Sequence, residues 1–146
     1  MLPRFARGKF HPKNAEKYVG LSTPTYRSSW EHAFMRLCDE HPNVYKWASE
    51  SITIPYRHPF TGQYTVYVPD FFIVYNDKNS KKHAELVEVK PASQTTMEAA
   101  GKSMAKKKQV IINMAKWEAA NAYAKQNKLR FRVVSEEQLF HNGQRK

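Results

Sequence analysis

Apolar residues first recur at helical spacing near the start of the chain. Within residues 28–39, Trp30, Phe34 and Leu37 share one face, as in an amphipathic helix with one buried side. Ser28 and Glu31 form the Ser-x-x-Glu pattern of a capping box. The pattern predicts a helix that begins at Ser28 or Ser29 and ends near Asp39, before His41-Pro42-Asn43.

Further along, β-prone segments alternate with polar turns. The predicted strands are residues 52–56, 64–75, 83–90 and 129–133, with turns at 57–63 and 76–82. Pro69 within the second strand implies a bulge, a bend or a sheet edge, because proline cannot donate to a strand ladder.

A long helical stretch separates the last two predicted strands. It covers residues 97–126, is capped by Thr95 or Thr96, and can be divided at Gly101 and the lysine run that follows. A last short helix is expected from Ser135. The order of helix, three strands, helix and strand predicts an α/β fold with a mixed four-stranded sheet flanked by helices (αβββαβ).

The domain organisation follows from the same pattern. Residues 23–140 are expected to form one domain, preceded by a basic arm at 1–22 and followed by a loose tail at 141–146. Two interpretations of the arm stay open. It is either a solvated segment with a few residues docked on the core or an arm that follows DNA phosphates.

The amino-acid composition limits the classes of binding partner that this protein is expected to have. The net charge is +11, from 24 Lys and Arg against 13 Asp and Glu among 146 residues, which favours nucleic acid. No apolar run approaches the roughly 18 residues of a membrane span, and no amphipathic helix has a dense basic face, so no membrane partner is expected. The single cysteine and the scattered histidines argue against a disulfide and a zinc site.

Two acids interrupt the most strand-like segments. Residues at i and i+2 of a strand share a face, so Glu88 and Lys90 project together while Val89 faces the core. Asp70, beside the Pro69 irregularity, is expected to lie close to Glu88. Paired carboxylates repel each other unless a cation lies between them, and oxygen ligands suit Mg²⁺ or Mn²⁺. Glu85, on the Val89 side, is interpreted as ordinary surface charge.

This arrangement predicts phosphodiester hydrolysis. A divalent ion acidifies bound water, and Lys90 beside it can orient or deprotonate the attacking water.

Two other acids have simple structural explanations as well. Glu31 fits a helix cap, and Glu50 fits a turn acid before a strand, although either can be a further ligand.

The spacing Pro69-Asp70, then Glu88-Val89-Lys90, resembles the PD-(D/E)xK nuclease superfamily. The segments GKFHPKNAEKYVG (8–20), TYRSSWE (25–31), WASESITIPY (47–56) and KWEAANAYAKQNKLRFRVVSEEQL (116–139) resemble the head-completion nuclease family of T-even-type phages. YRSSWE is also similar to an element of the cleavage subunit of some heteromeric transposases, where the helix-one glutamate completes the metal site.

The resemblance implies a restriction-endonuclease-like core and a Mg²⁺-dependent DNA endonuclease whose products carry 5′-phosphate and 3′-hydroxyl ends. Asp70, Glu88 and the Val89 carbonyl would ligate the metal, and Glu31 would complete the site. The protein would act late in head assembly, in the host cytoplasm or on the virion, with head or neck proteins as partners. A non-catalytic DNA-binding head protein and a branched-DNA resolvase remain alternatives.

DNA contacts are expected from three groups. Tyr26, Arg27 and Ser28 precede the N-terminus of the first helix, where backbone N–H groups favour anions. Lys106, Lys107 and Lys108 begin the basic part of the later helix, and Asn113 and Lys116 follow on it. Capping, packing or a solvated charged face is the structural alternative for these groups.

Overall fold

A mixed four-stranded sheet lies at the centre of the protein. The computed structural model describes residues 7–135. The sheet consists, from edge to edge, of β3 (Val44–Ser49), β6 (Phe71–Asn76), β7 (Lys82–Val89) and β8 (Arg130–Val134). β6 pairs antiparallel with β3 and β7, whereas β8 runs parallel to β7. The predicted mixed four-stranded sheet is confirmed.

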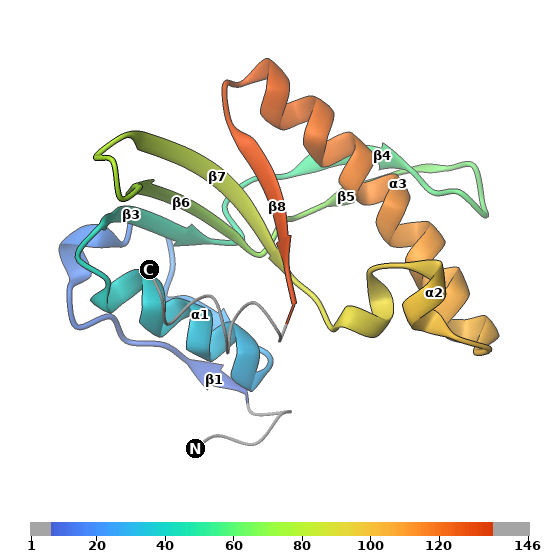
Figure 1. Cartoon of the computed structure of the whole chain (residues 1–146), viewed down its shortest axis with the longest axis horizontal. Coiled ribbons are helices and arrows are strands. Elements are labelled where there is room, and N and C mark those ends of the chain that lie inside the picture. Colours follow the sequence, from blue (N-terminus) through green and yellow to red (C-terminus); the bar gives the residue numbers. More distant parts are fainter. Residues whose placement is uncertain (1–6, 136–146) are drawn as a thin grey trace.

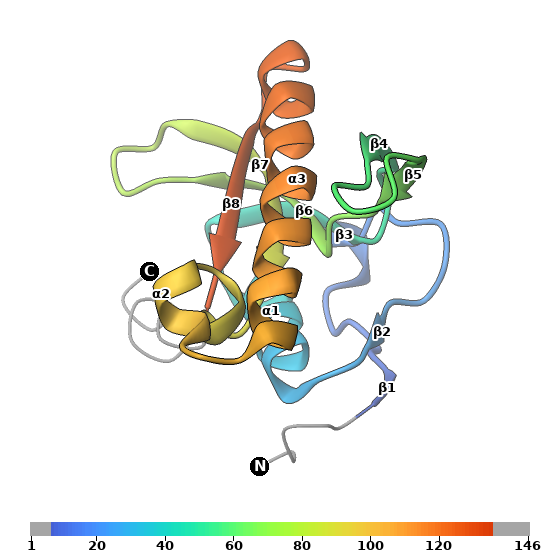
Figure 2. The ribbon, with the colours of Figure 1, turned by 90° about the vertical axis from the view of Figure 1, so that its right-hand side faces the viewer.

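One long helix covers each face of this sheet, as Figures 1 and 2 show from two sides. α1 (Ser29–Glu40) packs Phe34 and Met35 into a core cluster that includes Val87, whereas Ala120 of α3 (Met104–Gln126) joins Leu86 in a second cluster. Neighbouring residues of β7 enter different clusters because side chains alternate along a strand. The core elements follow the predicted order: α1, β3, β6, β7, α3, β8.

The first helix begins and ends close to the predicted residues. The hydroxyl of Ser28, the N-cap, accepts a hydrogen bond from the Glu31 N–H at 3.1 Å, and the His41 N–H donates to the Leu37 carbonyl at 2.9 Å. Near the helix end, the buried Asp39 carboxylate accepts the backbone N–H groups of Lys13 and Asn14, each at 2.9 Å.

These contacts dock the described part of the basic arm, residues 7–22, on the domain. Phe10 is buried in the α1 cluster, and Tyr18 packs edge-on against Trp47 with ring centroids 4.7 Å apart. The short elements β1 (Gly8–Lys9) and η1 (Ala15–Lys17) belong to this region, and β1 pairs antiparallel with β2 (Thr25–Tyr26), which follows it. These docked residues agree with the first interpretation of the arm, and its contact with DNA phosphates stays a prediction.

Two strand predictions were wrong in detail. The first core strand is β3, whose alternation is broken by a register irregularity between Val44 and Lys46. The predicted strand at 52–56 corresponds instead to β4 (Ile54–Arg57), which pairs with β5 (Tyr64–Tyr67) in a separate two-stranded hairpin. The predicted strand at 64–75 is therefore two strands. They separate around Pro69, which lacks the N–H needed to continue a ladder.

The long helical stretch divides at the predicted glycine. After η2 (Ala92–Gln94), α2 (Met97–Ala100) is capped by the Thr96 hydroxyl and ends at Gly101, whose φ of 65° favours glycine. Beyond Ser135, the predicted last helix and the tail at 141–146 lie outside the described residues. Within residues 7–135, no helix combines the length and apolar character that crossing a membrane requires.

Candidate active site

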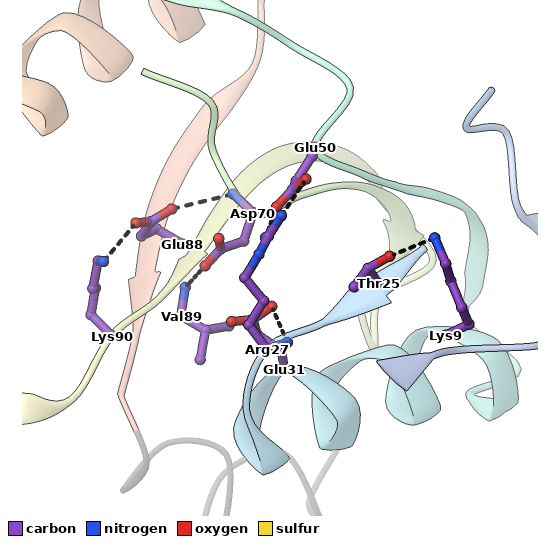
Figure 3. A network of polar contacts seen from close by, with 9 residues as sticks. All are labelled: Lys9, Thr25, Arg27, Glu31, Glu50, Asp70, Glu88, Val89 and Lys90. Carbon is purple, nitrogen blue, oxygen red and sulfur yellow. Dashed lines mark hydrogen bonds and ion pairs between the residues drawn. The ribbon is translucent and has the colours of Figure 1, made fainter. Parts of the chain in front are cut away.

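The end of β7 and the turn before β6 bring the two predicted acids together (Figure 3). The Asp70 N–H donates to Oε1 of Glu88 at 3.2 Å, and the Val89 N–H donates to Oδ2 of Asp70 at 2.8 Å. Glu88 is the second-last residue of β7 and is only 4% exposed. Each acid is thus oriented by the backbone of the segment that carries the other.

The predicted lysine lies beside this pair. Nζ of Lys90 is 3.6 Å from Oε2 of Glu88, and the Lys90 backbone N–H donates to the Val134 carbonyl at 3.0 Å. The parallel partner β8 therefore fixes the lysine backbone while its ammonium remains partly accessible. Val89 points the opposite way into the α1 cluster, as the alternation required.

Burial and mutual repulsion make it unfavourable for both carboxylates to be ionised at the same time. Burial, followed by the charge of Glu88, raises the pKa of Asp70 well above its usual range, although the Val89 N–H opposes the rise. Burial also raises the pKa of Glu88, against the opposing charge of Lys90. A cation between the two carboxylates would relieve this cost.

Glu31 lies on the first turn of α1, opposite these acids in Figure 3. Its Oε1 accepts a hydrogen bond from the Arg27 N–H at 3.2 Å. In a capping box the glutamate would accept from the N–H of the N-cap, Ser28, so the bond is displaced by one residue. Burial raises the Glu31 pKa, and the charges of Glu50 and Glu88 add to the rise. Glu31 therefore bonds to the backbone just before the helix and also lies near the carboxylate pair.

Glu50 is close to the same group, although the sequence favoured a turn acid. Both its carboxylate oxygens bond to the Arg27 guanidinium, and its N–H donates to the Asp70 carbonyl at 2.9 Å. Its φ of 50° lies in the left-handed region, a strained conformation for glutamate that is frequent at functional sites. The sequence offered no signal for this backbone conformation.

The other predicted DNA contacts fall into different surroundings. Tyr26 packs edge-on against His32 with ring centroids 4.7 Å apart, and Ser28 caps α1. Lys106 and Lys108 are exposed near the N-terminus of α3, whereas Lys107 is half-buried there. Tyr26 and Ser28 thus have structural roles in packing and helix capping. The exposed side chains of Lys106 and Lys108 are accessible to DNA phosphates.

The prediction for Asn113 was wrong. The side chain is fully buried, its Nδ2 donates to the Gln94 carbonyl at 3.0 Å, and its Oδ1 accepts from Gln109 at 3.0 Å. A buried amide with these bonds fastens η2 to α3 and cannot reach DNA. Lys116 does face the site. Burial and then the charge of Lys90 lower its pKa, whereas Glu88 and Asp70 raise it.

The donor set suits a hard divalent cation. Within residues 7–135, no group of three or more His, Cys, Asp or Glu side chains is arranged so that it could hold a metal ion. The site does contain two buried carboxylates that disfavour simultaneous ionisation, with Glu31 within electrostatic range. Oxygen-only ligands of this kind fit Mg²⁺ or Mn²⁺, which retain several waters.

Comparison with known proteins identifies the family. The model of the TnsA-like endonuclease N-terminal domain matches residues 41–136. Over 142 residues, the chain is 32% identical to the head completion nuclease of Enterobacteria phage T4, covering 90% of this chain and 92% of that protein. The chain belongs to the head-completion nuclease family. As a member of this family, it is a nuclease with a TnsA-like endonuclease domain, which contains Asp70, Glu88 and Lys90.

One acid of this nuclease was misinterpreted from the sequence. Glu85, taken as surface charge, is 4% exposed. Its Oε1 accepts from Nε of Arg132 at 3.0 Å, and its Oε2 accepts from the Tyr75 hydroxyl at 2.7 Å. The partner arginine is on β8, 47 residues further along the chain, so no local sequence pattern could predict this ion pair. Both partners of Glu85 lie within the sheet, on β6 and β8, so this carboxylate supports the sheet rather than the candidate active site.

Proposed function

We propose that this nuclease is a Mg²⁺- or Mn²⁺-dependent DNA endonuclease with a restriction-endonuclease-like, PD-(D/E)xK core. The observation that carries the proposal is the reciprocal backbone bonding of Asp70 and Glu88 beside Lys90. Buried acids of this kind are costly without a cation, and the family is one of nucleases. The αβββαβ order of the core elements agrees with such a fold.

Asp70 and Glu88 would hold the metal, with the Val89 carbonyl and Glu31 as further ligands. The metal would supply an acidified water and take up charge that develops on the scissile phosphate. The two backbone N–H bonds to Asp70 and Glu88 leave other oxygen lone pairs of each carboxylate unused, since an ionised carboxylate has about four acceptor sites. These bonds would keep the remaining oxygens oriented.

Lys90 would position the attacking water and stabilise the negative charge that grows on the phosphate oxygens. Its ammonium is held beside Glu88 by the ion pair at 3.6 Å. Hydrolysis that leaves 5′-phosphate and 3′-hydroxyl ends follows the resemblance to the PD-(D/E)xK superfamily. Lys90 is thus the residue whose removal should affect chemistry most and folding least.

Basic residues on α3 would supply affinity that is independent of sequence. Lys106, Lys107 and Lys108 would contact backbone phosphates, and Lys116 would approach the strand near the cleaved bond. Tyr26, Arg27 and Ser28 would flank the DNA at the start of α1. The net charge of +11 supports this proposal, because phosphate neutralisation dominates non-specific DNA binding.

In its biological setting, the enzyme would act on DNA late in phage head completion, in the host cytoplasm or associated with the virion. The name of the T4 relative supports this role. Head or neck proteins would be its partners.

Plasmid cleavage by wild type, Asp70→Asn and Lys90→Ala, with titrated Mg²⁺ and Mn²⁺, tests the proposal. The matched control is Lys82→Ala, because Lys82 is the exposed lysine at the opposite end of β7. We expect Lys90→Ala to cleave roughly 100-fold more slowly or worse, with DNA binding retained and the control active. No wild-type nicking under any metal condition would favour a structural head protein, and selective cutting of four-way junctions by a dimer would favour a resolvase.

A further inference from the structure

Tyr67 is a buried residue next to the candidate active site to which the proposed chemistry gives no role. It is the last residue of β5, opposite Ile54 of β4, and is 4% exposed. Its ring lies edge-on to Phe131 of β8, with centroids 6.5 Å apart, and Nζ of Lys116 lies 5.7 Å from its centre. The ring is therefore fixed between the β4–β5 hairpin, the central sheet and α3.

The Tyr67 hydroxyl is buried without a hydrogen bond of ordinary geometry to any residue in the described range 7–135. Such groups are rare in native proteins and are unfavourable for stability. Phenylalanine would fill the same space and avoid this cost. Packing alone therefore does not explain a tyrosine at this position.

The hydroxyl lies on the side of the sheet that carries the Glu88 carboxylate, because Tyr67 shares a core cluster with Leu86 and Glu88 follows Leu86 by two residues on the same face of β7. After burial, the charge of Glu88 is the largest influence that raises the pKa of Tyr67, and the Tyr67 hydroxyl in turn favours the charged form of Glu88. Glu88 already accepts from the Asp70 N–H on Oε1 and pairs with Lys90 through Oε2. Its carboxylate has lone pairs for a third donor.

We propose that Tyr67 is a positioning residue whose O–H donates to Glu88 and fixes the orientation of this carboxylate in the working enzyme. This inference rests on the proposed function of Glu88 as a metal ligand. Hydrogen bonds at catalytic sites are often long before substrate binds and shorten in the complex. The chain between Tyr67 and Asp70 is only Val68-Pro69, so one short segment would supply both the Asp70 N–H and the Tyr67 O–H to Glu88.

Tyr56 provides a matched control. It is on the partner strand β4, is 8% exposed, belongs to the same core cluster, and has Nζ of Lys116 6.0 Å from its ring centre. Its hydroxyl is not among the buried groups without a partner in the described residues. Tyr56→Phe and Tyr67→Phe therefore remove the same atom from one hairpin, but only the second removes a donor to Glu88.

The experiment measures thermal unfolding, Mn²⁺ binding by calorimetry without DNA, and kcat and KM on plasmid for wild type and both variants. Tyr67→Phe should unfold at the wild-type temperature or above it. Its Mn²⁺ affinity and kcat should fall roughly tenfold, the size typical for residues that orient metal ligands, with KM for DNA little changed. Tyr56→Phe should match wild type in Mn²⁺ affinity and kcat.

A double-mutant cycle keeps the test independent of any effect on folding. In a Glu88→Gln background, adding Tyr67→Phe should change Mn²⁺ affinity no further, because the residue acts through Glu88. Wild-type kcat and Mn²⁺ affinity in Tyr67→Phe, or an equal loss in both backgrounds, would overturn the inference alone. A wild-type protein that binds no divalent ion and cleaves no DNA would overturn the proposed function and this inference with it.

Discussion

The backbone N–H of Asp70 donates to the carboxylate of Glu88 at 3.2 Å across the β6–β7 pair. This bond joins residues 18 positions apart in the chain and holds two acids where burial disfavours both charges. Such an arrangement is costly for a protein that uses these acids only for packing. It is useful where a divalent cation must be held on rigid strands.

The carboxylate pair predicts opposite effects of charge removal with and without metal. Without metal, Asp70→Asn should raise the thermal stability, because the raised pKa of Asp70 means that its charge opposes folding at neutral pH. The asparagine can still accept the Val89 N–H. With Mg²⁺ at roughly 100 times its Kd, wild type should gain about 2.7 kcal/mol and the variant much less.

Calorimetric unfolding in EDTA and in Mg²⁺ checks this prediction. Asp77→Asn is the control, because Asp77 is in the β6–β7 turn, remote from the pair, and its pKa is lowered to about 2 chiefly by His83. Equal stabilisation of wild type and Asp70→Asn by Mg²⁺ would remove Asp70 from the metal site.

The exposed lysines at the start of α3 should contribute to DNA affinity by neutralising phosphates. Replacing Lys106 and Lys108 with alanine should weaken duplex binding and reduce the slope of log K against log salt by about 0.9 for each phosphate that is no longer neutralised. Fluorescence anisotropy over a salt series measures the slope. Lys125→Ala, near the other end of the same helix and exposed, should leave it unchanged, and an unchanged slope in the double variant would make these lysines a solvated face.

Asn113 should contribute to stability rather than to DNA binding. Asn113→Ala leaves the Gln94 carbonyl and the Gln109 amide without their partner, which should cost about 1–3 kcal/mol in the free energy of unfolding. Urea denaturation measures this cost, and anisotropy on the folded variant should give the wild-type Kd. Normal stability with weakened DNA binding would make Asn113 a DNA-binding residue after all.

The hydrogen bond from the Tyr75 hydroxyl to the buried Glu85 carboxylate predicts an alkaline limit to stability. Burial, together with the hydrogen bond and charge of Glu85, raises the pKa of Tyr75 from 10.0 to about 12. Above pH 10 the unfolded chain loses this proton while the folded protein keeps it, so stability falls as the pH rises from 10 towards 12. Chemical denaturation over this interval should show a steeper loss in wild type than in Tyr75→Phe, and parallel curves would contradict the assignment.

Local pattern was a good guide where the partners of a residue lie nearby in the chain. The Ser28 cap and the break at Gly101 depend on contacts within a turn, and the pairing of β6 with β7 follows from a short connection. The irregular β3 was missed because Tyr45 and Lys46 are both exposed and interrupt the alternation. Asn113 was misplaced because nothing in a helical repeat distinguishes a buried amide from an exposed one.

The amino-acid sequence by itself determined both helices of the core, three of its four strands, the spacing of Asp70, Glu88 and Lys90, and the resemblance to the head-completion nucleases. These follow from residue-level preferences and short-range periodicity. Only the tertiary structure decided that Glu85 is buried and bonded to Arg132, that Glu50 lies beside Arg27, and that the Tyr67 hydroxyl is buried. The physical reason is that desolvation and ion pairing depend on which distant segments pack together, and residues far apart in sequence carry no local sign of that packing.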